Sequence, residues 1–588
     1  MLKIISFIKP NEWMHILLVN LIAILQVYLS MMIPHYMRRI TTLVQAPESQ
    51  MSEIAAAGGL MILCTLGALI CVFIIGFFAS RTSAALSMRL REMLFSKVGD
   101  FSMEEFSRFS TGSLIARSTN DVTQVQQFVM SALQMMLRIP ILTIGGFIGI
   151  ARTGAHWTIA ALIAFCFVIL VIIISMLVVM PQFKKMQSLV DKLNITVRES
   201  LVGRHVVRAY NAEDFHEERF ETANSGFTNA DRYANRAMAV MNPVMSLGTD
   251  GLTIAVYVIG AFLIWQMQYT EALVVFSNMI VMSFYLRLLF DAVKFTTKIV
   301  PRIPRAMVSA GRIVEVLETE PAIMDGELKE GLPGIVGEIT FKNVGFRYTG
   351  AGANALENIS FTATQGETVA FIGSTGSGKT TLINLVMRFF DATEGEVLIN
   401  GVNVKEYNLE ALNNKIGYIP QKSVLFKGSV SSNVAYGENG KGGYSTSDIE
   451  RAIRIANAEE FVTKLSDGID SEISQRGANL SGGQKQRLSI ARAIFRNPEI
   501  LIFDDSFSAL DYKTDGQLRR ELKTDTLTSA ATKLIIAQRI GTIMDADQII
   551  VLDGGKIAGV GTHAELMKSC KVYQEIAKTQ LSEEVMAS

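Results

Sequence analysis

The sequence is that of a long, apolar and electrically neutral chain. It has 588 residues, with 55 Lys and Arg against 55 Asp and Glu, and it is 49% hydrophobic and only 19% charged. Neutrality removes the general attraction to nucleic acids, so we expect no nucleic-acid partner. The low charge and a mean hydropathy of +0.31 exclude a disordered chain and place part of it in lipid. The four cysteines have neither a disulfide nor a metal-site spacing.

Apolar segments in the first half are long enough to cross a bilayer, which takes roughly 20 residues each. The first is long for a signal peptide and lacks a small-residue cleavage site, so we expect an uncleaved span. Basic residues concentrate between spans two and three and between spans four and five, which predicts cytoplasmic loops and termini. The six predicted spans are Ile16–Ile33, Ala56–Ala79, Val129–Ile150, Trp157–Met180, Val244–Met267 and Ala272–Phe290.

The two basic loops are unusually long and have helical periodicity, as at Leu86, Leu90 and Met93. If each loop forms two helices, each arm reaches roughly 30 Å beyond the membrane. Such arms suit mechanical coupling to a cytoplasmic domain, and a helical ledge without a moving role fits the pattern equally well.

The composition changes after the sixth span. A stretch rich in Gly, Pro and charge, Thr319–Gly334, is typical of a linker. Beyond it, short apolar strands alternate with helical segments, which predicts a mostly parallel sheet covered by helices. We therefore predict a membrane domain at 1–317, a linker at 318–335, an α/β domain at 336–578 and a tail at 579–588.

A phosphate-binding loop follows the apolar strand Val369–Ile372. The loop reads G-x-x-x-x-G-K-[ST] and leads into a helix, which is the required strand–loop–helix context. Its backbone N–H groups and the helix dipole favour phosphate oxygens, Lys379 supplies a cation to the β- and γ-phosphates, and the Thr380 hydroxyl ligates Mg²⁺. The predicted ATP-binding residues here are Gly373, Ser374, Thr375, Gly376, Ser377, Gly378, Lys379, Thr380 and Thr381.

Two further motifs belong to the same chemistry. The apolar strand Ile500–Phe503 ends at Asp504, a candidate Mg²⁺ ligand, and Asp505 follows where a base for the attacking water would lie. A second phosphate-binding helix start lies between the phosphate loop and the acidic pair. It consists of Ser481, Gly482, Gly483 and Gln484. The simplest use of two such starts on one chain is an ATP held between the loop of one subunit and the Ser-Gly-Gly turn of another.

These motifs, together with six spans and long cytoplasmic loops, resemble an ATP-binding cassette (ABC) exporter half-transporter over nearly the whole chain. The signature Leu480–Gln484 with the phosphate loop is highly specific for this class. The resemblance implies an α-helical six-span transmembrane domain fused to an α/β P-loop nucleotide-binding domain. It implies that Tyr348 stacks on adenine and that Gln421 contacts Mg²⁺ and senses the arms. It also places the coupling helices near Phe106–Leu114 and Tyr210–Phe215.

The chain departs from the family at two catalytic positions. Asp505 stands where Glu is usual, and its carboxylate is set back by roughly 1.5 Å. Gln538 stands where His is usual, and an amide carries no titrating proton. With Lys379, Thr380 and Asp504 retained, the chain resembles the degenerate-site subunit of heterodimeric multidrug-type exporters. A second half-transporter would then use the intact signature of this chain, and a sluggish homodimer is the competing interpretation.

The substrate is less well specified. Methionine-rich spans suit a pocket that accepts many apolar shapes, so we expect a bacterial plasma-membrane exporter of amphipathic compounds from the cytoplasm or inner leaflet. A lipid flippase, a peptide exporter and an ATP-gated channel or sensor are the alternatives; a peptidase-bearing peptide exporter is disfavoured because no extra domain precedes Ile16.

Few charges interrupt the spans, and intramembrane charges either contact substrate or pair structurally. Asp250 and Arg287 have similar predicted depths, and we expect them to form an ion pair or to share a polar cavity. Gly145 and Gly149 form a Gly-x-x-x-Gly pair that we expect to pack helices. The charges within the spans are Arg138, Asp250, Arg287 and Asp291.

Overall fold

The computed structural model describes residues 2–45, 49–265, 269–299, 302–436 and 445–580. The chain divides into two compact units. The helical unit comprises Met1–Gly99 and Thr111–Thr319, and the α/β unit comprises Asp100–Ser110 and Glu320–Ser588. The short helix α4 (Met103–Arg108) therefore belongs to the α/β unit, although segments of the helical unit flank it in sequence.

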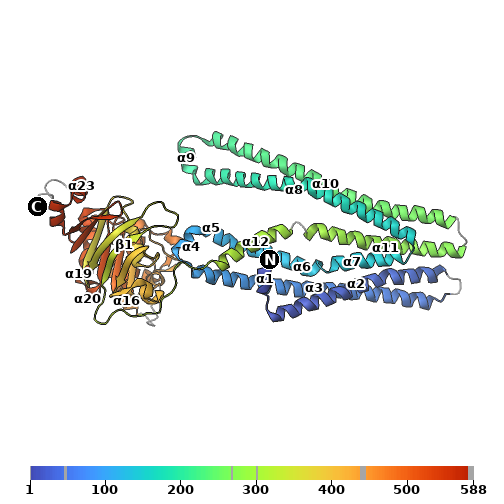
Figure 1. Cartoon of the computed structure of the whole chain (residues 1–588), viewed down its shortest axis with the longest axis horizontal. Helices are drawn as coiled ribbons and strands as arrows, with labels where there is room; N and C mark the ends of the chain where they lie inside the picture. The colour runs from blue at the N-terminus through green and yellow to red at the C-terminus, as the bar shows by residue number, and fades with distance from the viewer. Residues whose placement is uncertain (1, 46–48, 266–268, 300–301, 437–444, 581–588) are drawn as a thin grey trace. The chain divides into compact units, whose positions relative to one another are not determined.

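Long helices make up the helical unit (Figure 1). Helix α2 packs on α3, α8 packs on α10, and α11 packs on α2, α7 and α10. A π-helical turn, Arg117–Asp121, joins α5 to α6. The helices are α1 (Leu2–Ser6), α2 (Pro10–Gln45), α3 (Met51–Gly99), α5 (Thr111–Ala116), α6 (Val122–Met135), α7 (Arg138–Ala151), α8 (Ala155–Val202), α9 (Arg204–Ala209), α10 (Glu213–Trp265), α11 (Tyr269–Ile299) and α12 (Arg302–Glu318).

Five of the six predicted spans coincide with described helices that are long and apolar enough to cross a membrane. The fourth predicted span holds the shorter apolar helix Trp157–Val171, and the end of the fifth, at Met267, lies outside the described residues. Five of the six predicted spans are therefore confirmed, and the fourth coincides with an apolar helix that is shorter among the described residues. The five described helices that are long and apolar enough by length and composition are Pro10–Gln45, Met51–Gly99, Thr111–Ala151, Ser246–Trp265 and Glu271–Phe295.

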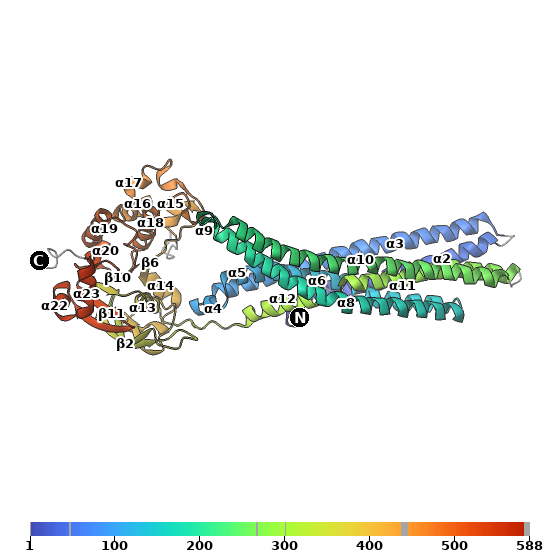
Figure 2. The same cartoon turned by 90° about the horizontal axis from the view of Figure 1, so that it is seen from above.

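The predicted arms are continuous extensions of the spans. Helices α3, α8 and α10 have 49, 48 and 53 residues, far more than a bilayer requires. Figures 1 and 2 both show α8 and α10 side by side with α9 at their shared end. On the α3 extension, Arg89 binds the Glu12 carboxylate at 2.7 Å, and both side chains are largely buried. This ion pair holds the start of α2 against the arm.

Glycines on α7 allow close helix packing, as predicted. A side chain at Gly145 would collide with Met31 of α2, and one at Gly149 would meet the Tyr285 ring of α11 at 2.6 Å. Helix α7 therefore approaches both neighbours through positions that have no side chain.

The expected Asp250–Arg287 ion pair is wrong for this chain. Both side chains are exposed, and neither has an ion pair within the ranges that the structure describes. Asp291 instead lies 3.8 Å from Lys294, and the Arg138 guanidinium lies 5.4 Å from the centre of the Phe295 ring. Matching depth fixes position along two helices but leaves their rotation about the axis undetermined, which is why the depth argument failed.

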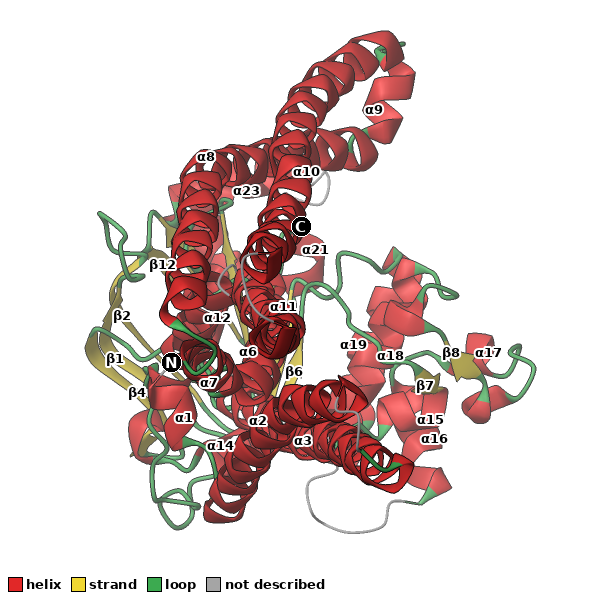
Figure 3. Ribbon diagram, turned by 90° about the vertical axis from the view of Figure 1, so that its right-hand side faces the viewer, coloured by secondary structure: helices red, strands yellow, loops and turns green. Residues whose placement is uncertain are grey.

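The α/β unit contains the predicted mostly parallel sheet, with strand order β12-β11-β3-β10-β9-β6. All neighbouring pairs are parallel except β11 with β12. A second, antiparallel sheet has the order β2-β1-β4-β5, and Figure 3 shows β1, β2 and β4 side by side. The strands are β1 (Ile339–Phe346), β2 (Leu356–Ala363), β3 (Thr368–Gly373), β4 (Glu394–Ile399), β5 (Val402–Asn403), β6 (Ile416–Ile419), β7 (Gly428–Ser429), β8 (Glu472–Ile473), β9 (Ile500–Asp504), β10 (Thr532–Ile536), β11 (Gln548–Asp553) and β12 (Lys556–Gly561).

The main sheet is buried on both faces, which explains its continuous apolar strands. Along β3, Val369 and Phe371 pack into one hydrophobic cluster, whereas Ala370 and Ile372 pack into the other. The covering helices are α13 (Lys379–Val386), α14 (Leu409–Lys415), α15 (Val430–Val434), α16 (Thr446–Ile455), α17 (Glu459–Val462), α18 (Gly482–Phe495), α19 (Tyr512–Thr524), α20 (Thr526–Ala530), α21 (Ile540–Ile543), α22 (His563–Ser569) and α23 (Lys571–Gln580).

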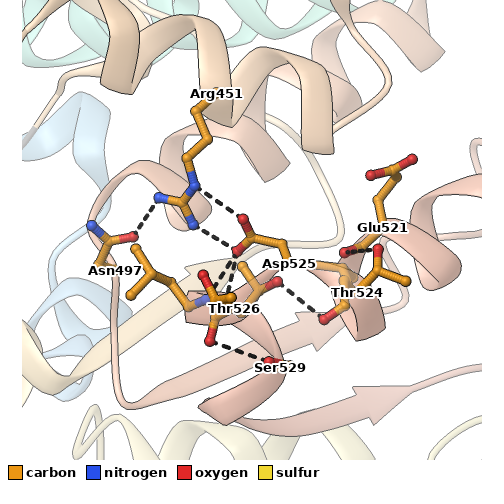
Figure 4. Close-up of polar contacts among 10 residues, drawn as sticks. Arg451, Asn497, Glu521, Thr524, Asp525, Thr526 and Ser529 are labelled. Carbon is orange, nitrogen blue, oxygen red and sulfur yellow. Dashed lines mark hydrogen bonds and ion pairs between the residues drawn. The ribbon is translucent and has the colours of Figure 1, made fainter.

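Helices α15 to α18 gather on one side of this sheet and form a helical lobe (Figure 2). An ion pair ties the lobe to the helices beyond it. Arg451 of α16 donates to both carboxylate oxygens of Asp525, at 3.1 and 2.7 Å, and to Asn497 at 3.0 Å (Figure 4). Asp525 also caps the start of α20 by accepting from backbone N–H groups. The carboxylate thus connects α16 to the start of α20.

Candidate functional site

The phosphate loop lies between β3 and α13. Gly376 and Gly378 adopt left-handed backbone conformations, with φ of 84° and 97°, and Gly378 immediately precedes α13. A side chain at Gly378 would also collide with Leu356, so this loop requires glycine. Every predicted residue from Gly373 to Thr381 lines one cavity of about 840 Å³.

Lys379 folds back over the loop. Its Nζ donates to the Gly373 and Ser374 carbonyl oxygens at 2.9 and 2.8 Å, and to Ser377 Oγ at 3.3 Å. Burial lowers the pKa of Lys379, and the carboxylates of Asp505 and Asp504 oppose that shift. The ammonium group is therefore held at the loop, where a phosphate would gain from it.

Oxygen ligands for a divalent cation meet at the end of β9. Thr380 Oγ1 donates to Asp504 Oδ1 at 3.4 Å, and the Tyr418 hydroxyl donates to Asp504 Oδ2 at 3.4 Å. Burial raises the pKa of Asp504, because it disfavours the ionised carboxylate. A bound cation would stabilise that ionised form. A hydroxyl and one carboxylate, completed by phosphate oxygens and water, fit Mg²⁺. Tyr418 was not predicted; its only sequence signal is its place near the end of the neighbouring strand β6.

Asp505 lies beside Asp504 in a left-handed conformation, with φ of 49°, which is uncommon for a non-glycine residue. Its Oδ2 accepts from Gln538 Nε2 at 2.6 Å and from Gln421 Nε2 at 3.2 Å. Burial raises the pKa of Asp505, and the two amides oppose that shift. The structure thus brings together the three predicted residues and ties one carboxylate oxygen to both amides.

An aromatic group borders the other end of the cavity. The Tyr348 hydroxyl lies 3.0 Å from Thr381 Oγ1, and the Tyr348 ring meets Phe346 and Phe390 edge-on. The adjacent Thr349 donates to Glu104 of α4 at 2.6 Å. The ring that was predicted to stack on adenine therefore lines the cavity, next to the contact with α4.

The signature turn lies apart from this cavity. Ser481 caps α18: Ser481 Oγ accepts from Gln484 N at 3.3 Å, and Gln484 Oε1 accepts from Ser481 N at 2.8 Å. Ser481 and Gly482 are exposed, and across the described chain none of the four predicted signature residues lines the cavity. The phosphate loop and the signature turn of one chain therefore do not form one site.

Residues of the C-terminal helix also line the cavity, and they were not predicted. Val572, Glu575, Ile576, Thr579 and Gln580 form its wall from α23. Nothing in the local pattern of an amphipathic terminal helix distinguishes a cavity wall from ordinary packing.

Sequence models of two protein families match the chain: the ABC transporter transmembrane region over residues 16–286 and the ABC transporter over residues 356–508. An uncharacterized ABC transporter ATP-binding protein of Mycobacterium tuberculosis is 38% identical over 528 residues, covering 89% of this chain and 87% of that protein. The ATP-dependent lipid A-core flippase of Pseudomonas aeruginosa is 31% identical over 515 residues, covering 88% of this chain and 83% of that protein.

A solved structure shares the fold across both units. It is that of a bacterial Atm1-family ABC exporter with ATP bound, with a TM-score of 0.79 and 23% identity, and it covers 98% of this chain and 100% of that one. The chain belongs to the ABC transporter family and is an exporter half-transporter, with the helical unit as its transmembrane domain and the α/β unit as its nucleotide-binding domain.

Proposed function

We propose that this half-transporter binds MgATP at its own phosphate loop but hydrolyses it slowly, and that a different half-transporter supplies the fast site. The observation that carries the proposal is the restraint on Asp505, whose Oδ2 accepts from Gln538 at 2.6 Å and from Gln421 at 3.2 Å. A general base must lie within hydrogen-bond reach of the water that it activates. A short carboxylate held by two amides is drawn away from that position, and Gln538 cannot relay a proton.

The main groups for nucleotide binding are distinct from the two changed residues, Asp505 and Gln538. The loop N–H groups and Lys379 hold the phosphates, the Tyr348 ring supports the adenine, and Thr380 and Asp504, with Gln421 nearby, hold Mg²⁺. When bound, Mg²⁺ neutralises charge on the β- and γ-phosphate oxygens. The site is therefore built to keep ATP, and its defect lies in the hydrolytic step.

The signature turn completes the partner's site in this proposal. Ser481 and the amides of Gly482 and Gly483 lie at an exposed helix start, where a phosphate of a second subunit's ATP would gain hydrogen bonds and the helix dipole. The partner chain carries the usual Glu and His. A homodimer of this chain would combine two slow sites and give a sluggish exporter.

The chain alone tests the first part of the proposal. Purified in lipid nanodiscs, it should bind MgATP and show little turnover. Because the chain supplies both a phosphate loop and an intact signature, the double variant Asp505→Glu with Gln538→His should gain turnover by about 100-fold when two copies associate. The matched control, Asp505→Asn with Gln538→His, restores no carboxylate and should stay slow. Rapid turnover by the parent chain alone would contradict the proposal.

For the substrate, we propose amphipathic compounds taken from the cytoplasm or inner leaflet of a bacterial plasma membrane, with the nucleotide-binding domain on the cytoplasmic side. The spanning helices carry many exposed apolar side chains and several methionines, which suit adaptable apolar contacts. A lipid flippase is the second candidate, because relatives are named lipid A-core flippases. Inside-out vesicles distinguish the two: a lipophilic dye should accumulate with ATP, whereas a flippase would move a fluorescent phospholipid instead.

A further inference from the structure

The C-terminal helix α23 forms hydrogen bonds to the backbone of the segment that carries Gln538. Gln580 Nε2 donates to the Gln538 carbonyl oxygen at 2.8 Å, and Gln580 Oε1 accepts from Ile540 N at 2.9 Å. One side-chain amide thus satisfies a donor and an acceptor two residues apart, as a neighbouring β-strand would. Two simultaneous bonds fix both the position and the orientation of that segment.

The bond to Ile540 satisfies a donor that would otherwise lack a partner. Ile540 is the first residue of α21, and the first N–H groups of a helix have no partner within it. Arg539, the residue before α21, forms no side-chain cap bond in the described structure. Gln580 therefore acts as the cap from another element, and α21 starts where α23 places it.

Contacts away from the cavity hold α23 in place. Tyr573 and Ala577 are buried, and the Tyr573 hydroxyl lies 2.7 Å from His563 Nδ1 of α22. Gln574 Nε2 donates to the Met567 carbonyl oxygen at 2.9 Å. Tyr573, Ala577 and Gln580 follow helical spacing, so the exposed Gln580 lies on the same side of α23 as the two buried residues and lines the cavity. The helix is thus anchored independently of the segment that it holds.

Gln538 connects the Gln580 hydrogen bonds to Asp505. The Gln580 side chain binds the Gln538 backbone, and the Gln538 side chain donates to Asp505 at 2.6 Å. An amide nitrogen has two N–H groups, so Gln538 retains one donor for a γ-phosphate oxygen. Gln580 itself lines the same cavity as the phosphate loop.

We propose that Gln580 is a positioning residue, which holds the Gln538–Ile540 segment so that the Gln538 amide faces Asp505 and the γ-phosphate at once. This inference rests on the proposed function, in which the site binds ATP without rapid hydrolysis. ADP has no γ-phosphate, so the effect of Gln580 falls on ATP and leaves ADP nearly unchanged. The C-terminal helix thereby sets how well this site distinguishes ATP from ADP.

The test measures the affinities of Mg-AMP-PNP and MgADP by calorimetry on the full chain in nanodiscs. Gln580→Met keeps the length of the side chain and removes both hydrogen bonds, so the preference for AMP-PNP over ADP should fall by about fivefold. Gln574→Met is the matched control: it is the same change on the same helix, it removes one bond to a carbonyl, and it should leave the preference unchanged.

Two outcomes overturn the proposal: an unchanged preference in Gln580→Met, or an equal loss in Gln574→Met, which would show a general loosening of α23. If Gln580→Met does not fold, Gln580→Glu replaces it, because this variant keeps the acceptor for Ile540 N and loses the donor to Gln538. Its preference should fall by about twofold, and an unchanged value overturns the proposal equally. Failure of the proposed function is separate, since it would appear as rapid turnover of MgATP by the parent chain.

Discussion

The phosphate loop and the signature turn are both helix starts that contain glycine, yet their surroundings differ. The signature turn keeps all the residues of its motif, and Ser481 and Gln484 form a capping box at the start of α18. The phosphate site keeps Lys379 and Asp504. Its two residues that differ from the usual ones, Asp505 and Gln538, are in contact, since Gln538 donates to Asp505. The two changed residues therefore form one hydrogen-bonded unit beside Lys379 and Asp504, and the proposed separation of ATP binding from hydrolysis rests on this arrangement.

The largest expected effect lies at the signature turn. In the proposed complex with a second half-transporter, purified through a tag on this chain, Ser481→Arg should lower steady-state ATP turnover by about 100-fold or more, because a bulky cation would occupy the place proposed for the partner's nucleotide. Loss of the cap alone costs only about 1 kcal/mol. Ser481→Thr keeps the hydroxyl and the cap and should retain most of the turnover. Full turnover in Ser481→Arg would show that this turn serves no active site.

The next effect concerns the connection between the two regions. Arg451 joins the helical lobe, which carries the signature, to Asp525, which lies between α19 and α20 (Figure 4). Arg451→Met should reduce the free energy of unfolding of the full chain in detergent by about 2–3 kcal/mol, since it removes charged hydrogen bonds from a largely buried carboxylate. Arg520→Met, at an exposed arginine that donates to a backbone carbonyl on its own helix, should change it far less. Equal stabilities would disprove the connection.

The same ion pair predicts a dependence on pH. Hydrogen bonds from Arg451 lower the pKa of Asp525 from 3.8 to about 2. Because the folded-state pKa lies below the unfolded value, the ionised carboxylate contributes stability above pH 3.8 and loses it as the pH falls towards 2. The stability difference between the parent and Asp525→Asn should therefore be about 2 kcal/mol at neutral pH and shrink over that acid range. A constant difference would exclude ionisation of Asp525 as the cause.

The parts of the site that could be predicted are those that follow from strand order and local motif. Strand β3 leads into the phosphate loop and β9 ends at Asp504, and parallel strands bring these ends to one edge. The contacts that were missed join distant segments: Gln580 lies 42 residues beyond Gln538 and Tyr418 lies 86 residues before Asp504. No periodicity specifies which residue of a terminal helix meets a loop.

The membrane helices also show that local sequence patterns predict elements better than contacts between distant segments. Apolar length identified the spans, because the bilayer sets a minimum for each helix. The Gly145 and Gly149 packing followed from small residues at helical spacing. The Asp250–Arg287 pairing failed because rotation about each helix axis depends on how whole helices pack, which depth does not determine.

The smallest expected effect tests whether the phosphate site of this chain and its signature turn contribute unequally to ATP turnover. In the same proposed complex, Asp505→Asn should change ATP turnover by less than about twofold, because the proposed slow site would contribute little to the total and Asn retains an oxygen that accepts from Gln538. Ser481→Arg, prepared in parallel, gives the scale for loss of the fast site. The ratio of the two turnovers is independent of the partner's absolute rate, since both variants share that partner. If Asp505→Asn proves as damaging as Ser481→Arg, then Asp505 serves a working hydrolytic site, and the contacts from Gln538 and Gln421 orient a functional base instead of restraining a weak one.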